Sequence, residues 1–311
     1  MSDVTATMIK DLRVQSGAGM MDCKTALVEN GGDMEAAIDW LRTKGLMTAA
    51  SKSGRVAADG LIGVAASGTS GAVVEVNSET DFVARNETFQ GMVSKVADIA
   101  LAEGGDLAAL MAAEFESGQS VEAHIADMIA TIGENMSVRR TAALEVGSGV
   151  VAHYVHNRIG DDLGKIGVLV ALESTGDAGK LHELAHQIAM HIAASAPLAV
   201  NVEDLDPAVV ERERKVLVAE AAESGKPAEI IDKMVEGRLR KFHEDVVLTA
   251  QTFVIDGERR VGQVVEDAAA EMGAEVTLKD FVCFRLGEGI DKGESDFAAE
   301  VAATVAETDK S

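Results

Sequence analysis

The sequence is poor in basic and aromatic side chains. Its 311 residues include 28 lysines and arginines against 52 aspartates and glutamates, which gives a formal net charge of −24, and only 3% are aromatic. Nucleic-acid affinity depends on a basic surface that releases counterions, and single-stranded bases stack on aromatic rings. The composition therefore disfavours direct binding to DNA or RNA, whereas 47% hydrophobic residues are typical of a globular chain.

Cysteines and long apolar runs are also scarce. The two cysteines, Cys23 and Cys283, lie far apart in the chain and form no CxxC motif, which favours a reducing compartment and a role as small buried hydrophobes. The N-terminal MSDVTATMIKDLR lacks the basic region and apolar core of a signal peptide. No run approaches the roughly 18 apolar residues of a membrane span. We therefore expect a cytoplasmic protein that does not bind a membrane, with about two domains at this length.

Residues 1–50 predict three short helices. The first surrounds residues 8–12 and the second contains residues 23–27. Asp33 is placed to cap the third, whose apolar residues recur with helical spacing until Gly45 ends it. Residues 1–60 carry 7 basic and 8 acidic groups, a net charge of −1. This helical module is therefore nearly neutral, and the acidity lies elsewhere.

The hydrophobic pattern changes after residue 58. The stretch LIGVAASGTSGAVVEV predicts two strands around a turn rich in glycine and serine. A polar loop, NSETDFVARN, precedes a predicted helix at about 88–102, and further helical segments fill roughly 106–140. Two more predicted strands, VVAHYVHNR and IGVLVALES, precede a helix at about 179–195. The repeated order of hairpin and helix predicts an internal duplication.

The C-terminal part alternates helices and a strand. Residues 207–245 have the pattern of an antiparallel helical hairpin with charges of alternating sign. A helix at about 261–272 precedes the β-run VTLKDFVCFRL, which is expected to join the second sheet. An acidic amphipathic tail covers residues 291–311. The whole pattern predicts an α+β chain built from several modest modules.

One pentapeptide resembles a zinc-protease motif. HELAH at 182–186 matches HExxH, in which two histidines bind zinc and the glutamate is the base, but a catalytic zinc needs a third protein ligand. At about 100° per residue, His191 falls on the other flank of the helix from His182 and His186, so it cannot be the third ligand of the same ion. Glu203 remains a candidate for that ligand. We interpret these histidines as structural or interface residues, with a zinc protease as the alternative. The predicted buried stripe consists of Leu181, Leu184, Ala185, Ile188 and Ile192.

The loop after the first hairpin places an aromatic residue beside an acid in a polar stretch. On pattern alone, the favoured interpretation is that Phe82 turns inward and Asp81 caps the following helix. The alternative is that Phe82 points outward as a wedge aimed at a partner. Residues 61–150 carry 4 basic and 13 acidic groups, a net charge of −9. The stretch around this loop is therefore acidic, whereas the N-terminal module is nearly neutral.

At this point the chain resembles the bacterial elongation factor Ts family over essentially its whole length. The resemblance rests on seven blocks in order: LRVQSGAGMMDCKTAL (12–27), AADG (57–60), EVNSETDFVARN (75–86), IGENMSVRR (132–140), IAMHIAASAP (188–197), SGKPAEIIDKMVEGRLRKF (224–242) and FRLGEGIDKGESDFAAEVAA (284–303). Ordered blocks are far more specific than a single pentapeptide, and one of them contains the second half of the helix that carries HELAH.

The resemblance implies an α+β fold with two related core subdomains, each with a small antiparallel sheet. The implied division is a ubiquitin-associated-like (UBA-like) helical domain at 1–55, a core N-subdomain at 56–147, a core C-subdomain at 148–202 and 246–290, an antiparallel helical hairpin of the coiled-coil or dimerisation type at 203–245, and a C-terminal module at 291–311.

The resemblance also implies a function. The family exchanges guanine nucleotides on elongation factor Tu during translation elongation, in protein biosynthesis in the cytoplasm. It disturbs the Mg²⁺ and the phosphate-binding region of its partner, so that GDP leaves and GTP binds. Such a protein binds the GDP-bound and the nucleotide-free partner, is not an enzyme in the usual sense, and needs no cofactor or metal of its own. Whether the hairpin forms a homodimer or contacts the partner stays open, as does a pure scaffold role.

Site residues follow by correspondence with the family motifs. The segment associated with displacing magnesium corresponds to Thr80, Asp81, Phe82 and Val83. Further partner contacts correspond to Arg13, Met20, Met21 and His156. The stretch 157–165 is longer than the family pattern, which bears on the placement of His156.

Overall fold

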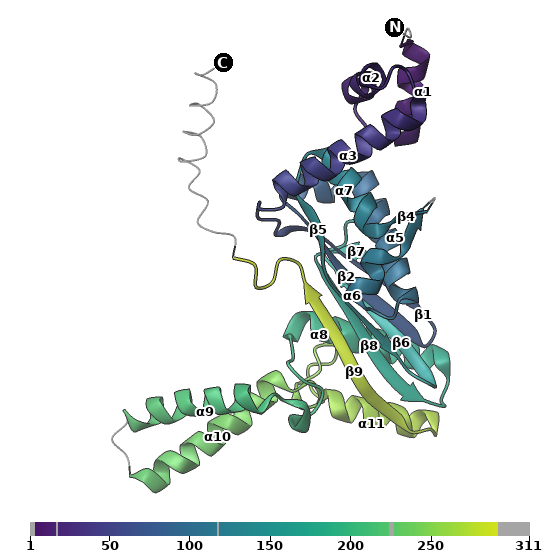
Figure 1. Ribbon diagram of the computed structural model, residues 1–311. Coiled ribbons are helices and arrows are strands. Elements are labelled where there is room, and N and C mark those ends of the chain that lie inside the picture. Colours follow the sequence, from purple (N-terminus) through teal and green to yellow (C-terminus); the bar gives the residue numbers. More distant parts are fainter. Residues whose placement is uncertain (1–3, 17, 117, 224–226, 292–311) are drawn as a thin grey trace.

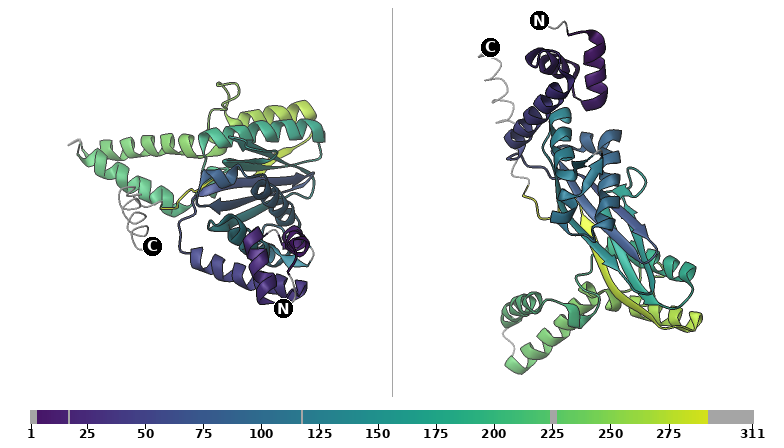
Figure 2. Two further views of the ribbon diagram at one scale, coloured as in Figure 1. Left: turned by 90° about the horizontal axis from the view of Figure 1, so that it is seen from above. Right: turned by 45° about the vertical axis from the view of Figure 1, so that its right-hand side comes forward.

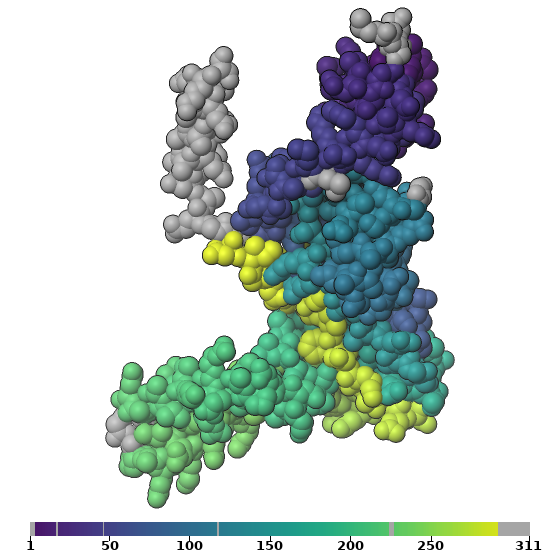
Figure 3. Space-filling model, viewed as in Figure 1, coloured from purple at the N-terminus to yellow at the C-terminus, as the bar shows by residue number. Residues whose placement is uncertain are grey.

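The computed structural model describes residues 4–16, 18–116, 118–223 and 227–291. It has an α+β fold, as predicted: a central body of sheets and helices carries a helical module at one end and a projecting pair of helices at the other (Figure 1). The space-filling view shows that this pair, α9 (Pro207–Ala222) and α10 (Ala228–Val246), stands away from the body as an arm (Figure 3). In the described ranges, no helix is both long enough and apolar enough to cross a membrane.

Three helices form the N-terminal module: α1 (Ala6–Ser16), α2 (Met20–Glu29) and α3 (Met34–Lys52). The side chain of Asp33 caps α3 as predicted, accepting a hydrogen bond of 3.0 Å from the Ala36 N–H. The module has a small core of its own, consisting of Leu12, Cys23, Ala26, Leu27 and Ala37. The burial of Cys23 agrees with its predicted role as a small hydrophobe.

The prediction that Gly45 ends the third helix is wrong, because α3 continues to Lys52. Gly45 is buried where α3 lies against α7 (Val121–Ile132). A Cβ atom there would lie 3.4 Å from Asp127 Oδ1 and 3.5 Å from Ala130 Cβ. A longer side chain would push the two helices apart, so this glycine permits a close helix crossing and does not mark a helix end.

The first sheet has the order β5-β2-β1-β7, and all neighbouring strands are antiparallel. Its strands are β1 (Asp59–Ser67), β2 (Ser70–Ser78), β5 (Met136–Glu145) and β7 (Leu163–Gly164). Helices α5 (Glu87–Ala102), α6 (Leu107–Ala112) and α7 share one hydrophobic core with it. A two-stranded sheet, β3 (Glu114–Glu116) with β4 (Gln119–Ser120), lies between α6 and α7 in the chain.

Strand β5 corrects the predicted helical content of residues 106–140. Helix α7 ends at Gly133, whose φ of 86° favours glycine, and β5 begins at Met136. Met136 and Val138 are buried while Ser137 between them is exposed. This alternation is the strand signal that the helical assignment of 136–140 overlooked.

The second sheet repeats the plan of the first. Its order is β6-β8-β9, with β6 (Gly149–His156), β8 (Ile166–Ser174) and β9 (Val276–Arg285), and it is also antiparallel. In both sheets a hairpin precedes a helix, and a third strand later pairs with the second strand of the hairpin across a register shift. Helices α8 (Ala178–Ser195) and α11 (Val261–Met272) share the core of this sheet. The predicted duplication is confirmed.

The two sheets stack in the middle of the body, with helices on both outer faces (Figure 2). The core between the sheets contains residues of both, including Ile62 and Val73 of the first and Val151 and Leu169 of the second. Gly167 lies at the contact, where an added Cβ would lie 2.5 Å from the Ile62 side chain. The sheets therefore form one rigid support for the loops at their ends.

The arm consists of α9 (Pro207–Ala222) and α10 (Ala228–Val246), which match the predicted hairpin at 207–245. Short 3₁₀ turns, Val202–Asp204 and Leu248–Ala250, lie next to it in the chain. The arm has its own small buried core, Leu217, Ala221, Val235 and Leu239. Of the predicted C-terminal tail, residues 292–311 lie outside the described residues.

A buried carboxylate ties the end of the described chain to the first sheet. Glu75 of β2 is fully buried and accepts hydrogen bonds from Arg139, Arg140, Asn77 and, at 2.8 Å, the Gly287 N–H. Successive residues of a regular strand point to opposite faces, but a register shift at Glu75 bends β5 locally, so both arginines reach the carboxylate. Arg139 also donates to the Glu288 carbonyl after β9 at 2.7 Å, and Arg140 donates to the carbonyl of Arg285, the last residue of β9, at 3.0 Å.

These contacts decide the ionisation of Glu75. Burial alone would raise the pKa of this carboxyl, but hydrogen bonds from the Gly287 N–H, Arg140 and Asn77 outweigh burial and hold the pKa below its ordinary value of 4.5. Because the folded-state pKa is lowered, the stabilisation is complete above the unfolded-state pKa. It is lost as the pH falls through the folded-state pKa.

We predict that Glu75→Gln lowers the free energy of unfolding by about 2 kcal/mol at pH 7, because it leaves two partly buried guanidinium groups without the buried carboxylate that pairs with them. The variant should also lose less stability than the parent between about pH 5 and pH 3. Urea unfolding followed by circular dichroism at several pH values measures both effects. Glu288→Gln is the control, since this half-exposed carboxylate lies 3.3 Å from Arg140 and should contribute less than about 1 kcal/mol. Equal stability of the two variants would contradict the prediction.

Candidate partner-binding site

Phe82 points into solvent. It belongs to α4 (Asp81–Ala84), a single helical turn that follows β2 directly, and its side chain is 76% exposed. The next two residues, Val83 and Ala84, are buried in the core beneath α5. One turn of helix cannot turn residues 82, 83 and 84 all inward, and the two aliphatic residues occupy the inner face. The favoured prediction that Phe82 turns inward is therefore wrong. The ring points outward, and its role as a wedge aimed at a partner stays a prediction.

Asp81 does not cap the helix that follows. The cap of α5 is Asn86, whose Oδ1 accepts hydrogen bonds from the N–H groups of Thr88 and Phe89 at 2.9 and 3.3 Å. The Asp81 carboxylate instead lies 2.9 Å from Arg85 Nη2, and the Arg85 side chain is exposed while that of Asp81 is half-exposed. An exposed pair of this kind contributes little to stability, so a partner could separate it at small cost.

Thr80 is held in place from several sides. Its N–H and its hydroxyl both donate to the Glu134 carboxylate, at 3.0 and 2.8 Å, and its carbonyl oxygen accepts from the Ser78 hydroxyl at 3.0 Å. Of the segment expected to act on the partner, the structure thus presents Phe82 and Asp81 outward, while Thr80 and Val83 anchor the turn. Local sequence does not indicate a role for Glu134, because nothing local places it beside a residue 54 positions earlier.

The expected N-terminal contact residues are exposed. Arg13 lies near the end of α1, and Met20 and Met21, 59% and 70% exposed, begin α2. Val14 beside Arg13 is also exposed. Methionine side chains are flexible and polarizable, so this surface can adapt to an apolar partner surface.

His156 lies at the end of β6, with its side chain exposed and its Nδ1 3.0 Å from the Tyr154 hydroxyl. The longer stretch after it contains β7, which pairs with β1 of the first sheet. Lys165 ends this stretch: its N–H donates to the His156 carbonyl, and its ammonium lies 3.4 Å from the Gly60 carbonyl. Gly60 pairs with Asn77 near the end of β2, so His156 and the Phe82 turn lie at the same end of the stacked sheets.

The histidines of HELAH lie on α8 as predicted, beside a buried stripe that contains all five expected residues. The rings of His182 and His186 are stacked 6.4 Å apart, and His186 Nδ1 bonds the His153 carbonyl at 2.8 Å. His191 is buried elsewhere, hydrogen-bonded to Gln251 and accepting from the Val254 N–H. In the described part of the chain, no three His, Cys, Asp or Glu side chains come together in a way that could hold a metal ion.

Burial lowers the pKa of His191, and the hydrogen bond from its ring to Gln251 offsets this only in part. The Nδ1 atom accepts the Val254 N–H, so the proton of the neutral ring lies on Nε2 and is donated to Gln251. This histidine is therefore a satisfied core residue that joins α8 to the segment before α11.

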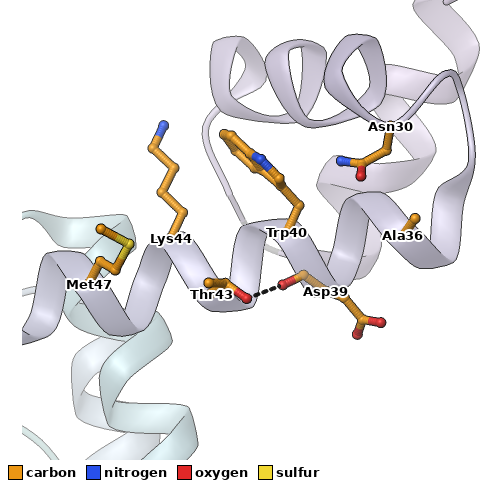
Figure 4. A pocket seen from close by; sticks show the side chains of 7 residues that line it. All are labelled: Asn30, Ala36, Asp39, Trp40, Thr43, Lys44 and Met47. Carbon is orange, nitrogen blue, oxygen red and sulfur yellow. Dashed lines mark hydrogen bonds between the residues drawn. The ribbon is translucent and has the colours of Figure 1, made fainter.

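A shallow groove lies along α3 of the N-terminal module (Figure 4). Two of its polar side chains have partners within the module: the Lys44 ammonium lies 2.7 Å from Asp22 and 5.2 Å from the centre of the Trp40 ring, and the Thr43 hydroxyl donates to the Asp39 carbonyl. The lining residues are Asn30, Ala36, Asp39, Trp40, Thr43, Lys44 and Met47.

Comparison with known proteins agrees with this arrangement. A family model described as Elongation factor TS matches residues 79–288. The protein named Elongation factor Ts of Parvibaculum lavamentivorans is 62% identical over 304 residues, which cover 97% of this chain and 99% of that protein. Those of Rhodospirillum rubrum and Rhodospirillum centenum are 59% and 58% identical, with the same coverage. The family model and these matches over nearly the full length show that the chain belongs to the elongation factor Ts family.

Proposed function

We propose that this protein is a guanine-nucleotide exchange factor for elongation factor Tu, acting in the cytoplasm during translation elongation. The observation that carries the proposal is the outward Phe82 on an anchored turn, together with membership of the family. Exchange needs contact with a second protein and no covalent step. The factor would bind both the GDP-bound and the nucleotide-free partner, with direct nucleic-acid or membrane binding playing no part.

The proposed mechanism acts on the two features that retain GDP. A GTPase holds its nucleotide largely through a phosphate-binding loop and Mg²⁺. Phe82 would insert between elements of the partner and displace the segments that position the metal and the phosphates. Asp81, released from its exposed pair with Arg85, would bring a carboxylate near that region. Val83 and Thr80 would support the turn from within.

Other surfaces would supply affinity. Arg13, Met20 and Met21 would hold the partner through a mainly apolar contact, and His156 would contact it at the same end of the sheets as Phe82. We also propose the division into a UBA-like domain, two core subdomains, a hairpin and a C-terminal module. Hairpin α9–α10 has exposed Val216, Val218 and Ile230, which suit either a homodimer or a second partner contact.

Two rival functions make different predictions. A zinc protease requires stoichiometric zinc and loses activity when His186 is replaced, so metal analysis of the purified protein distinguishes it. A pure scaffold binds elongation factor Tu without accelerating GDP release, so an exchange assay distinguishes it.

Phe82→Ala should lower the maximal rate of GDP release from elongation factor Tu at least about tenfold, because central aromatic anchors contribute most of the energy at interfaces. Stopped-flow release of a fluorescent GDP at saturating factor measures the rate. Ile255→Ala is the matched control, since Ile255 is an exposed apolar residue near α11. If Phe82→Ala accelerates release as well as the parent does, the wedge mechanism is wrong.

Ionic strength should affect the two contact regions differently. Raising salt from about 50 to 500 mM should slow association with elongation factor Tu several-fold, because the acidic first core subdomain attracts a region that contains the metal. Met21→Ala should weaken the complex by the same factor at both salt concentrations, because it removes apolar contact. Surface plasmon resonance measures both effects. An association rate constant independent of salt would count against the acidic contact.

A further inference from the structure

We infer that Glu134 is a positioning residue for nucleotide exchange, which fixes the turn that presents Phe82. The inference rests on the proposed function, since it assumes that Phe82 acts on the partner. Thr80, the residue that precedes α4, does not cap this helix with its side chain.

Thr80 occupies the N-cap position of α4, with the extended backbone expected there, φ −128° and ψ 158°. A threonine at this position ordinarily accepts a hydrogen bond from its own helix, but this side chain makes no such cap. Its hydroxyl donates instead to Glu134 Oε1 at 2.8 Å, and its N–H donates to Glu134 Oε2 at 3.0 Å. The entry to α4 is therefore fixed by a carboxylate from a distant part of the chain.

Glu134 is itself held firmly. It follows Gly133, which ends α7, and precedes Asn135, whose N–H donates to Glu79 Oε1 at 2.6 Å. Residues 79–80 and 134–135 thus exchange hydrogen bonds reciprocally, each segment supplying a carboxylate to the other. We name these four residues the loop clasp.

The loop clasp also reaches the N-terminal module. The Asn135 amide donates to the Arg55 carbonyl at 2.7 Å, and the Arg55 guanidinium lies 3.3 Å from Glu79 Oε2. Arg55 comes three residues after the end of α3, and α3 lies against α7. Glu134 comes directly after Gly133, the C-cap of α7. One set of contacts therefore sets the position of the Phe82 turn relative to the module that carries Met20 and Met21.

A positioning role follows from the shortness of α4. An isolated helical turn is unstable in water, because nucleation fixes several residues for one hydrogen bond. An exposed phenylalanine also gains free energy by finding apolar cover. Val83 and Ala84 anchor the turn on one side, and the bidentate contact from Glu134 to Thr80 anchors it at its start. A ring that is held in place loses less entropy when it inserts into a partner.

The decisive experiment compares GDP release from elongation factor Tu with the full-length parent, Glu134→Ala and Glu134→Gln, over a range of factor concentrations. We expect Glu134→Ala to lower the maximal release rate about tenfold, with the half-saturating concentration changed less than about twofold. Glu134→Gln should restore the rate to within about threefold, because its amide can accept the Thr80 N–H and donate to the Thr80 hydroxyl. Glu271→Ala is the control, since this exposed carboxylate pairs with Lys180 in the other half of the body.

The double variant separates positioning from general stability. If Glu134 acts through Phe82, then Glu134→Ala should have almost no further effect on the release rate in a Phe82→Ala background. A full additional tenfold loss there, or a parental rate for the single Glu134→Ala variant, would overturn the inference. A parental rate for Phe82→Ala alone would instead overturn the proposed wedge, so the two failures are distinguishable.

A milder variant guards against loss of folding. Thr80→Val keeps the main-chain bond to Glu134 and removes the hydroxyl donor, so release should slow about threefold. Amide hydrogen exchange should be faster at residues 81–85 in this variant and unchanged in α8. A slower release rate with parental exchange at 81–85 would contradict the positioning role.

Discussion

An aromatic ring can act on a partner only if it is kept out of its own core, and the region between the stacked sheets and the N-terminal helices is organised around that constraint. Phe82 is outward because Val83 and Ala84 occupy the inner face of the same turn. The turn begins where Glu134 holds Thr80, and it follows a strand embedded in the first sheet. The sheets, the helices behind them and the loop clasp together make the presentation of one side chain rigid.

Strand β2 carries this organisation along its length. Glu75 binds two arginines and the chain after β9, and Glu79 and Thr80 at its end make the loop clasp with residues 134–135. Although the chain is acidic overall, the carboxylates of Glu75, Glu79 and Glu134 each accept specific hydrogen bonds within the protein. The same strand therefore joins the second half of the body to the Phe82 turn.

Much of the fold could be predicted from local sequence. Helical spacing, the Asp33 cap and the turn between the first two strands indicated elements that the structure contains. The failures share a cause, which is that tertiary contacts decide the outcome. Gly45 lies at a helix crossing, and Phe82 points outward because its neighbours fill the core. Glu134 contacts a residue 54 positions earlier in the chain. Strand β5 is different, since the alternation of apolar and polar residues at 136–138 was visible in the sequence. The site residues themselves came from family resemblance, because no local pattern specifies a partner.

Phe82 is proposed to supply most of the free-energy coupling between binding of the factor and release of GDP. If the factor weakens GDP binding to elongation factor Tu, then GDP must weaken factor binding by the same ratio. The most direct test is the ratio of factor dissociation constants for the GDP-bound and the nucleotide-free partner, measured by calorimetry for the parent and for Phe82→Ala. The account predicts that this ratio falls at least about tenfold in the variant. An unchanged ratio would contradict it.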